Sequence, residues 1–314
     1  MLEEVERWLA ARSWSAADRP LHRLLAAKRA TGQTVSVVLP ALNEEETVGE
    51  IVTTIRRDLM CEAPLVDEVV VVDSASTDRT AQVAARAGAR VVHRDEILPR
   101  VPAVPGKGEV LWRSLLVTRG DIVCFVDADL RDFSPDFVSG TVGPLLTDPG
   151  VDLVKAMYDR PLGAADGQGG RVTELMARPL LNMHWPRLAG FVQPLGGEYA
   201  ARRALLERLP FPVGYGVELG MLVDALHLVG LDALAQVDVG VRRHRHQDGR
   251  ALGRMSAAIY RTAQLRLTRG HLVRPVLTQF ERGEDGFEPR TFPVDTEERP
   301  PMIEIPEYAE RRVA

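Results

Sequence analysis

The chain has 314 residues, of which 45% are hydrophobic, and a formal net charge of −5. A hydrophobic share of this size is ordinary for a globular protein and excludes a disordered one. The mildly acidic balance argues against a general nucleic-acid-binding protein, because phosphate contacts require a positive protein surface.

The first predicted elements are helical. Residues 1–30 have the apolar spacing of one or two amphipathic helices,. The β-branched run 34–39 then predicts a strand that is covered on both faces, and it stops at Pro40,. Apolar residues at helical spacing follow between residues 48 and 59, which predicts a helix there,.

Strands and helices continue to alternate up to about residue 130. The sequence predicts strands at 68–72, 89–92 and 121–126, with a helix from Ser76 or Thr77 to Arg86. Such alternation implies an α/β fold with a parallel sheet and right-handed crossovers. Ligands bind outside the carboxyl ends of such strands, so polar residues at these ends are candidates for a site.

The alternation is less regular after residue 150. The sequence predicts strands at 151–157 and 235–241 and helices at 171–182, 200–209, 216–229 and 249–268. From Arg274 onward the chain is rich in Pro and Glu with little periodicity, which predicts an extended tail packed on the body or on a partner.

The cysteines and the chain start indicate a compartment. Cys61 and Cys124 are too few for a disulfide framework, and the acidic start has no signal-peptide character,. No apolar run approaches the roughly 18 residues that a membrane-spanning helix needs. We therefore expect a cytoplasmic protein without an integral membrane segment.

Two common nucleotide-binding classes are disfavoured by the glycine pattern. The loop after the first strand has no glycine, so the dinucleotide fingerprint is absent,. The segment Pro105-Gly-Lys-Gly108 has neither the P-loop spacing nor its Ser or Thr,. A Rossmann dehydrogenase and a P-loop NTPase are therefore not expected.

The pair Asp127 and Asp129 offers another way to hold a diphosphate. Two carboxylates at a strand end can bind a divalent metal and a second ligand,. The alternative is a solvated turn in which Asp132 and Ser134 cap the next helix.

His244 and His246 lie among arginines at a predicted strand end, where alternation places both on one face,. Either could join the Asp pair on a metal, or both could be solvated surface residues. From Arg242 to Arg274 there are nine arginines and one acidic residue. A basic segment of this kind suits small anionic substrates if it faces the cleft.

Other polar residues each allow a binding role and a structural one. Lys107 could contact a phosphate as a point charge or be an exposed turn residue. Arg171 and Thr173 open a predicted helix, where they suit an anion or merely cap the helix. Glu218 begins an apolar helix, where it could face a ligand or only complement the helix dipole. Residues 43–46 could contact a nucleotide, or Asn43 and Glu46 could form a capping box,.

Taken together, these segments resemble the GT-A glycosyltransferases. The shared motifs are Val35-Ser-Val-Val-Leu-Pro-Ala-Leu-Asn-Glu-Glu45, Asp73-Ser-Ala-Ser-Thr-Asp78, Pro105-Gly-Lys-Gly-Glu109 and Val126-Asp-Ala-Asp-Leu130. More specific segments are similar to actinobacterial glucosyl-3-phosphoglycerate synthases. They are Gly169-Gly-Arg-Val-Thr-Glu-Leu175, Gln193-Pro-Leu-Gly-Gly-Glu-Tyr199, Gly214-Tyr-Gly-Val-Glu218, Val241-Arg-Arg-His-Arg-His246, Thr278-Gln-Phe280 and Glu298-Arg-Pro-Pro-Met302. The resemblance extends from about residue 34 to residue 302.

The resemblance implies a retaining, metal-dependent transfer of glucose from UDP-glucose or GDP-glucose to the 2-hydroxyl of 3-phosphoglycerate. The product, glucosyl-3-phosphoglycerate, would serve glucosylglycerate or methylglucose lipopolysaccharide synthesis. Two alternatives stay open. One is a mannosyl-3-phosphoglycerate synthase that uses GDP-mannose; the other is a polyprenyl-phosphate glycosyltransferase, which shares the first motifs.

The resemblance also implies site residues. The donor would be held by Pro40, Ala41, Leu42, Asn43, Glu45, Ser74, Lys107, Asp127, Ala128 and Asp129. The acceptor would be held by Gly170, Arg171, Val172, Thr173, Tyr215 and His246. Asp129 and His244 would bind Mg²⁺, for which Mn²⁺ or Co²⁺ could substitute. Asp129, Glu218 and the backbone carbonyl of Leu195 would lie at the reacting centre, and Glu218 is the candidate if a general base exists.

The implied architecture is a GT-A fold with a Rossmann-like, mostly parallel sheet flanked by helices and an extended C-terminal tail. We expect a helical extension at 1–33, a nucleotide-sugar-binding part at 34–150, an acceptor-binding part at 151–274 and the tail at 275–314. The expected partners are the two substrates and a second copy of the chain in a homodimer, with no nucleic acid.

Overall fold

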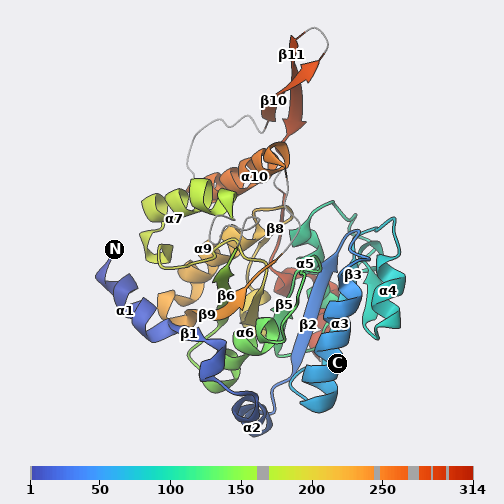
Figure 1. The fold of residues 1–314 in the computed structure, drawn as a ribbon, viewed down its shortest axis with the longest axis vertical. Coiled ribbons are helices and arrows are strands. Elements are labelled where there is room, and N and C mark those ends of the chain that lie inside the picture. Colours follow the sequence, from blue (N-terminus) through green and yellow to red (C-terminus); the bar gives the residue numbers. More distant parts are fainter. Residues whose placement is uncertain are drawn as a thin grey trace.

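The computed structural model describes residues 2–160, 170–243, 248–267, 276–283, 286–294 and 297–313. One eight-stranded sheet in this part runs through the molecule (Figure 1). Its strands lie in the order β1-β9-β6-β7-β5-β2-β3-β4. They are β1 (Ser13–Ser15), β2 (Val35–Ala41), β3 (Glu68–Asp73), β4 (Arg90–His93), β5 (Ile122–Phe125), β6 (Leu153–Asp159), β7 (Tyr199–Arg202) and β9 (Leu234–Val241).

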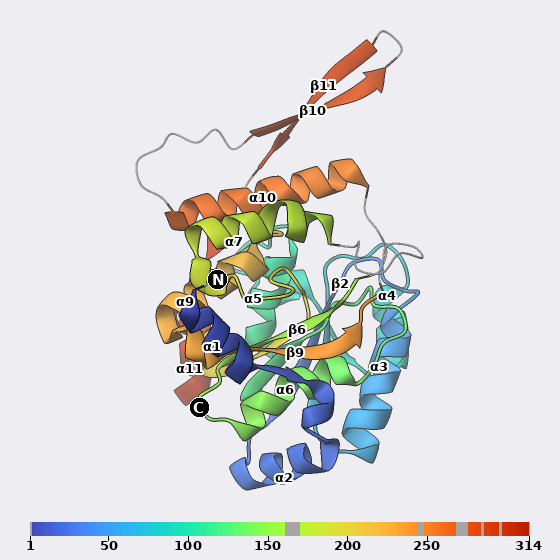
Figure 2. The same ribbon diagram turned by 60° about the vertical axis from the view of Figure 1, so that its left-hand side comes forward.

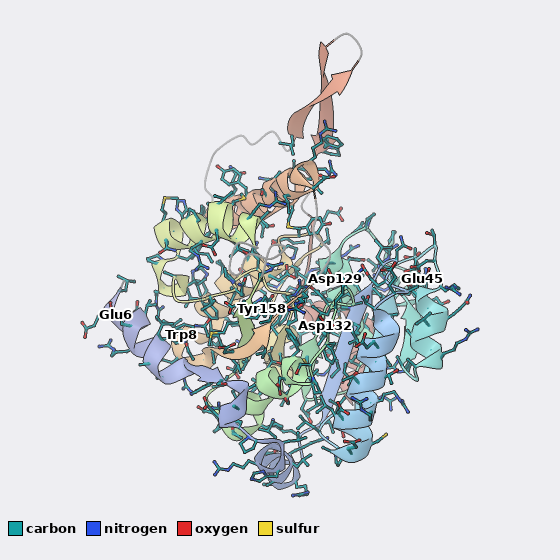
Figure 3. All side chains as sticks on the ribbon, viewed as in Figure 1. Glu6, Trp8, Glu45, Asp129, Asp132 and Tyr158 are labelled. Atoms are coloured by element: carbon teal, nitrogen blue, oxygen red, sulfur yellow. The ribbon has the colours of Figure 1, made fainter. Side chains whose placement is uncertain are left out.

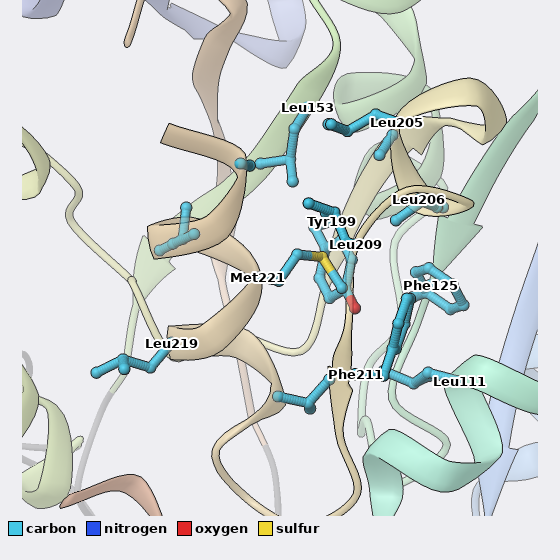
Figure 4. Packing of buried hydrophobic residues seen from close by; sticks show 14 of the residues in the cluster. Leu111, Phe125, Leu153, Tyr199, Leu205, Leu206, Leu209, Phe211, Leu219 and Met221 are labelled. Carbon is cyan, nitrogen blue, oxygen red and sulfur yellow. The ribbon is translucent and has the colours of Figure 1, made fainter. Parts of the chain in front are cut away.

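Helices cover both faces of the sheet. They are α1 (Glu3–Arg12), α2 (Leu21–Thr31), α3 (Val48–Arg56), α4 (Thr80–Arg86), α5 (Lys107–Val117), α6 (Asp136–Thr147), α7 (Arg178–His184), α8 (Arg203–Leu206), α9 (Val217–Val229), α10 (Gly249–Leu267) and α11 (Pro306–Val313). One core contains side chains of α1, α5 and α9, and Figure 4 shows part of it around Tyr199. The other contains side chains of α2, α3 and α6. None of the helices in the described ranges is long and apolar enough to span a bilayer.

The predicted strands are confirmed. Residues 34–39, 68–72, 89–92, 121–126, 151–157 and 235–241 correspond to β2, β3, β4, β5, β6 and β9. β2 pairs in parallel with both β3 and β5, so Ala41, Asp73 and the residues after Phe125 meet at one edge. This edge is where polar residues are expected to gather.

The predicted helix at 200–209 is wrong over its first residues. Tyr199–Arg202 is strand β7, antiparallel to both β5 and β6, and only Arg203–Leu206 is helical. The alanines of β7 have a low strand propensity, but they are buried between β5 and β6. Pairing with these two strands outweighs the local preference for a helix.

Helices α5 and α6 are absent from the sequence prediction for a physical reason. Residues 108–115 of α5 are buried without exception, and α6 is buried over most of its length. A helix that is covered all round has no polar stripe, so its periodicity is weak.

The predicted capping box of Asn43 and Glu46 is wrong, because α3 begins at Val48 and the Asn43 side chain accepts instead from the Thr77 N–H at 2.8 Å.

The C-terminal segment contains regular structure. β10 (Val276–Gly283) and β11 (Gly286–Pro293) form an antiparallel hairpin that projects beyond α10 in both views (Figures 1 and 2). β12 (Glu298–Arg299) then pairs with β8 (Phe211–Pro212). α11 follows, and its Tyr308 is buried in the core. The last part of the segment is thus packed on the body, as expected, but with strand and helical structure.

Candidate functional site

A cavity of about 730 Å³ lies at the carboxyl ends of β2, β3 and β5. Most of the predicted site residues line it, although they come from segments far apart in the chain. They are Pro40, Ala41, Leu42, Ser74, Lys107, Asp127, Ala128, Asp129, Gly170, Arg171, Val172, Thr173, Leu195, Tyr215 and Glu218. A volume of this size is typical of a pocket for a small organic ligand.

The two aspartates at the end of β5 are held by an arginine from another strand. Nη2 of Arg242, just after β9, lies 2.8 Å from Oδ2 of Asp127 and 3.3 Å from Oδ1 of Asp129. Figure 3 labels Asp129 in the middle part of the molecule. The Asp-x-Asp element is therefore part of a buried ionic network, not a solvated turn.

Glu198 is a third carboxylate in this network. Its Oε1 accepts from Nε of Arg242 at 2.8 Å, and its Oε2 accepts from the Tyr158 hydroxyl at 2.7 Å. The Arg242 side chain is only 3% exposed. Its Nη1 atom is buried without a hydrogen-bond partner among the described residues. An unpartnered guanidinium N–H beside a cavity is a donor available for an anionic ligand.

Lys107 lies on the other side of Asp127. Its ammonium donates to Asp127 and forms an ion pair with Oε1 of Glu218 at 2.8 Å. The glycines on either side make this placement possible. Gly106 has a φ of +141°, and a Cβ atom at Gly106 or Gly108 would collide with the backbone carbonyls of Val213 or Pro212. The Gly-Lys-Gly segment is thus pressed against the loop that leads to Glu218.

Charge within the cavity changes the proton affinities of these groups. Burial disfavours the Asp127 carboxylate, but Lys107 and Arg242 outweigh this effect and lower its pKa. Asp129 differs, because burial together with the charges of Asp127 and Glu198 raises its pKa despite Arg242. Arg242 therefore compensates the charge of Asp129 only in part, and a further cation beside it would restore the balance,.

Lys155 does not line the cavity itself but contacts a loop that does, and the sequence did not predict it as a site residue. It is almost fully buried in β6, and its ammonium donates to the carbonyl of Gly196 next to Leu195. Burial lowers its pKa to about 8. This contact anchors the loop whose Leu195 lines the cavity.

The remaining walls are of two kinds. Gly170, Arg171, Val172 and Thr173 form one wall where a π-helical turn begins (η4, Thr173–Ala177). Apolar side chains of α10, including Leu252, Met255 and Ile259, form another. Among the described arginines of the basic segment 242–274, Arg242 alone lines the cavity. The segment thus contributes one buried charge and an apolar wall.

Asn43 and Glu45 lie at the rim and do not line the cavity. Asn43 accepts from Thr77, and Oε2 of Glu45 accepts from Nε of Arg79 at 2.9 Å. Figure 3 shows Glu45 at the outer edge beside α4, away from Asp129. Their role in donor binding stays a prediction. His244 and His246 lie outside the described residues.

Some residues of the site were not assigned by sequence reasoning. Arg160 and Arg242 line the cavity, while Glu198 and Lys155 support it. Glu198 and Lys155 lie within buried, largely apolar surroundings. An isolated charge inside an otherwise apolar strand was the one available signal, because charged residues are rarely buried without a partner.

The donor set fits a hard divalent cation. Asp129 provides a carboxylate that lines the cavity and whose charge is only partly compensated by nearby cations. Carboxylate oxygens are the ligands that Mg²⁺ and Mn²⁺ prefer. In the described part of the chain no three His, Cys, Asp or Glu residues form a complete metal-binding group. Further ligands would therefore have to come from outside this set, for example from a bound diphosphate.

Comparisons with known proteins agree with this geometry. The glycosyl transferase family 2 model matches residues 36–169, which include the Asp pair. The chain is 53% identical over 304 residues to the glucosyl-3-phosphoglycerate synthase of Mycolicibacterium smegmatis, an alignment that covers 95% of this chain and 98% of the relative.

Two solved structures extend the likeness to the fold. One is glucosyl-3-phosphoglycerate synthase from Mycobacterium tuberculosis in complex with Mn²⁺, UDP and phosphoglyceric acid, at 50% identity and a TM-score of 0.82, covering 90% of this chain and 94% of that one. The other is mannosyl-3-phosphoglycerate synthase from Rubrobacter xylanophilus, at 43% identity and a TM-score of 0.89, covering 95% of this chain and 97% of that one.

A mostly parallel sheet with an Asp-x-Asp element at the end of β5, matched by this family model, defines a glycosyltransferase with the GT-A fold. Within that class, the chain belongs to the glucosyl-3-phosphoglycerate synthase family.

Proposed function

We propose that this protein transfers glucose from a nucleotide donor, UDP-glucose or GDP-glucose, to the 2-hydroxyl of 3-phosphoglycerate, with retention at the anomeric carbon. The observation that carries the proposal is the single cavity surface shared by the Asp-x-Asp element and by Arg171 and Thr173. It brings a diphosphate-binding edge and an anion-binding loop together, as a transfer between two bound substrates requires.

The donor side would be formed by the ends of β2 and β3 and by the Gly-Lys-Gly segment. Pro40, Ala41, Leu42 and Ser74 line the part of the cavity suited to a nucleoside. Lys107 is held in place by Asp127 and Glu218, where its positive charge can face the diphosphate. Asn43 and Glu45 would support the donor side indirectly, because they bind Thr77 and Arg79 in the loop before α4.

A divalent metal, Mg²⁺ or Mn²⁺, would be held by Asp129 and His244. When bound, it supplies Lewis-acid stabilisation of the negative charge on the leaving diphosphate. The solved complexes of the M. tuberculosis relative contain Mn²⁺ or Mg²⁺ together with UDP. The charge deficit at Asp129 supports the same role in this chain.

The acceptor would lie between η4 and the start of α9. The backbone at Gly170 and the side chains of Arg171 and Thr173 suit its phosphate and carboxylate. Two further residues would bind the acceptor. They are Tyr215, which is 47% exposed, and His246, the last residue of the basic run 242–246. Glu218 and the Leu195 carbonyl would face the reacting sugar carbon.

A second candidate is transfer of mannose. The observation in its favour is the high structural similarity to the R. xylanophilus mannosyl-3-phosphoglycerate synthase. The two reactions differ in the configuration of one hydroxyl of the donor sugar, so the same cavity could serve either.

A nucleotide-release assay tests these proposals. It compares UDP-glucose, GDP-glucose, UDP-mannose and GDP-mannose, each with and without 3-phosphoglycerate and with the metal removed by a chelator. We expect release that requires both acceptor and metal and is fastest with a glucose donor. Release that needs neither would contradict the proposal, and a preference for GDP-mannose would favour the second candidate.

The Asp129→Asn variant tests the metal role, and Asp132→Asn is its matched control. Asp129 faces the cavity, whereas Asp132 is exposed and pairs with Arg243. We expect a loss of about 100-fold or more in kcat for Asp129→Asn and little change for Asp132→Asn. Equal activities of the two variants would remove Asp129 from the metal site.

We also propose a homodimer. Exposed apolar side chains occur at Leu175 on η4, Met183 on α7 and Tyr260 on α10. α7 and α10 lie side by side in both views, beneath the hairpin (Figures 1 and 2). Light scattering after size exclusion measures the mass of the wild type and of Met183→Asp. A monomeric wild type would contradict the dimer.

Two further expectations belong to this proposal. The cytoplasm as compartment is supported by the free thiols of Cys61 and Cys124,. The division into an extension at 1–33, a donor part at 34–150, an acceptor part at 151–274 and a C-terminal segment at 275–314 is supported by the separate places of donor and acceptor residues around the cavity.

A further inference from the structure

A second cavity, of about 400 Å³, lies at the opposite end of the sheet. It is lined by the residues that precede β5, by α8 and by α11. Asp121, just before β5, lies at this cavity, and Asp127, just after it, lies at the first one. Six residues of extended chain span roughly 20 Å, so the two cavities are separate sites.

Positive charge gathers at this second cavity. Arg119, Arg203 and Arg311 are among the residues that line it. They come from the loop before β5, from α8 and from α11. Burial lowers the pKa of Arg311, and the charges of Arg203 and Arg119 add to this effect, while Tyr308 and Glu68 oppose it. Like charges held this close destabilise one another unless an anion lies between them.

The hydrogen bonds of two of these arginines do not neutralise them. Arg203 donates to the carbonyls of Gly120 and Leu115 and to the hydroxyls of Thr118 and Tyr308. Arg311 donates to the carbonyls of Leu116 and Thr118. Within the described part of the chain, neither forms an ion pair with a carboxylate. Their orientation is thus fixed by neutral groups, and their charge remains.

The two carboxylates at the cavity have other partners. Asp121 accepts from the backbone N–H and the hydroxyl of Thr34, each at 2.8 Å. Glu207 accepts from the Tyr308 hydroxyl at 2.5 Å. Arg202, which also lines the cavity, is paired with Asp152 at 3.4 Å. Neutral donors leave the charges of Asp121 and Glu207 in place as well. With Arg202 paired to Asp152, three guanidinium groups face two carboxylates, so the site keeps a small excess of positive charge.

We propose that this second cavity binds a small phosphorylated anion. Arginine guanidinium groups match the oxygens of a phosphoryl group in planar, paired hydrogen bonds. The cavity is large enough for a small metabolite,. The site is independent of the glycosyl-transfer chemistry, because none of its residues lines the first cavity.

Arg119→Gln in the full chain is the decisive variant. The Arg119 side chain is exposed, and its backbone, not its guanidinium, makes the contact to Glu68, so the variant is expected to fold normally. Inorganic phosphate is titrated calorimetrically at constant ionic strength. We expect about a tenfold loss of affinity at this site. Unchanged kcat and KM without phosphate are expected.

Arg57→Gln is the matched control, since Arg57 is exposed and its ion pair is with its chain neighbour Asp58. Arg171→Gln separates phosphate bound in the first cavity from phosphate bound in the second. Acetate replaces phosphate in a further titration. Phosphate binding that Arg119→Gln leaves unchanged, or equal binding of acetate, would overturn the proposal.

Crystals soaked in selenate, a phosphate-shaped anion with an anomalous signal, locate the site. We expect a peak among Arg119, Arg203 and Arg311 in the wild type and none in Arg119→Gln. A peak without any Arg119-dependent binding in solution would indicate binding at crystal concentration only and would also overturn the proposal.

Discussion

Arg242 donates from Nε to Oε1 of Glu198 at 2.8 Å, and both side chains are almost completely buried. From this anchored position the other end of the guanidinium contacts Asp127 and Asp129. One arginine after β9 therefore orients the Asp-x-Asp element that follows β5. The element depends on a residue more than a hundred positions away.

Replacing Arg242 by Gln is expected to destabilise the protein strongly. The change leaves the fully buried Glu198 without its cationic partner and the partly exposed Asp127 with less compensating charge. Breaking a buried ion pair in this way costs about 3–5 kcal/mol. Arg243→Gln is the matched control, because its side chain is 64% exposed and its ion pair is with the exposed Asp132. It should change the free energy of unfolding by less than about 1 kcal/mol. Denaturant unfolding of both variants measures the difference, and similar values would argue against the anchoring role of Arg242.

We expect the buried Lys155 to increase the free energy of unfolding as the pH rises through the alkaline range. Its pKa is lowered by burial from 10.5 to about 8. Between these values the unfolded chain binds a proton that the folded protein does not, so the free energy of unfolding increases as the pH rises. Relative to Lys155→Met, which has no titrating group, the wild type should gain up to about 3 kcal/mol across this interval. Parallel pH profiles of the two proteins, measured by urea unfolding, would contradict the prediction.

Gly197 is predicted to be intolerant of any side chain. A Cβ atom there would collide with the Asp127 carboxylate and the Lys107 ammonium. Gly197→Ala should lower kcat/KM by about tenfold or more, because displacement of either group disturbs the diphosphate edge. At Gly249 a Cβ atom meets nothing within 4 Å, so Gly249→Ala should retain activity. Steady-state kinetics distinguish the two, and a fully active Gly197→Ala would show that the contact can relax.

Arg171 separates acceptor binding from donor binding. If its partner is the anionic acceptor, Arg171→Ala should raise the KM for 3-phosphoglycerate by about tenfold or more, with a much smaller change for the nucleotide sugar. Arg187→Ala is a control, since Arg187 pairs with Glu4 on α1. Equal losses for both substrates would place Arg171 elsewhere in the reaction.

The strands around the site could be predicted from the sequence, and β7 could not. The runs at 34–39, 68–72 and 121–126 are β-branched and bounded by polar residues, so their period and composition agree. Tyr199–Arg202 has the composition of a helix and becomes a strand only because β5 and β6 pair with it on either side. The buried helix α5 gives no periodic signal for a related reason, since its whole circumference is covered.

By itself the sequence determined the α/β class and the edge at which residues 40–44, Asp73 and the Asp pair would gather, because local periodicity specifies the strands and parallel strands place their ends together. Lys107 and the Arg171 loop were assigned to the same site by the family resemblance. Only the tertiary structure decided the charge balance among these groups. Arg242, Glu198 and Lys155 acquire their roles through contacts between distant segments. It also decided that three arginines meet at the opposite end of the sheet, a cluster that no spacing along the chain reveals.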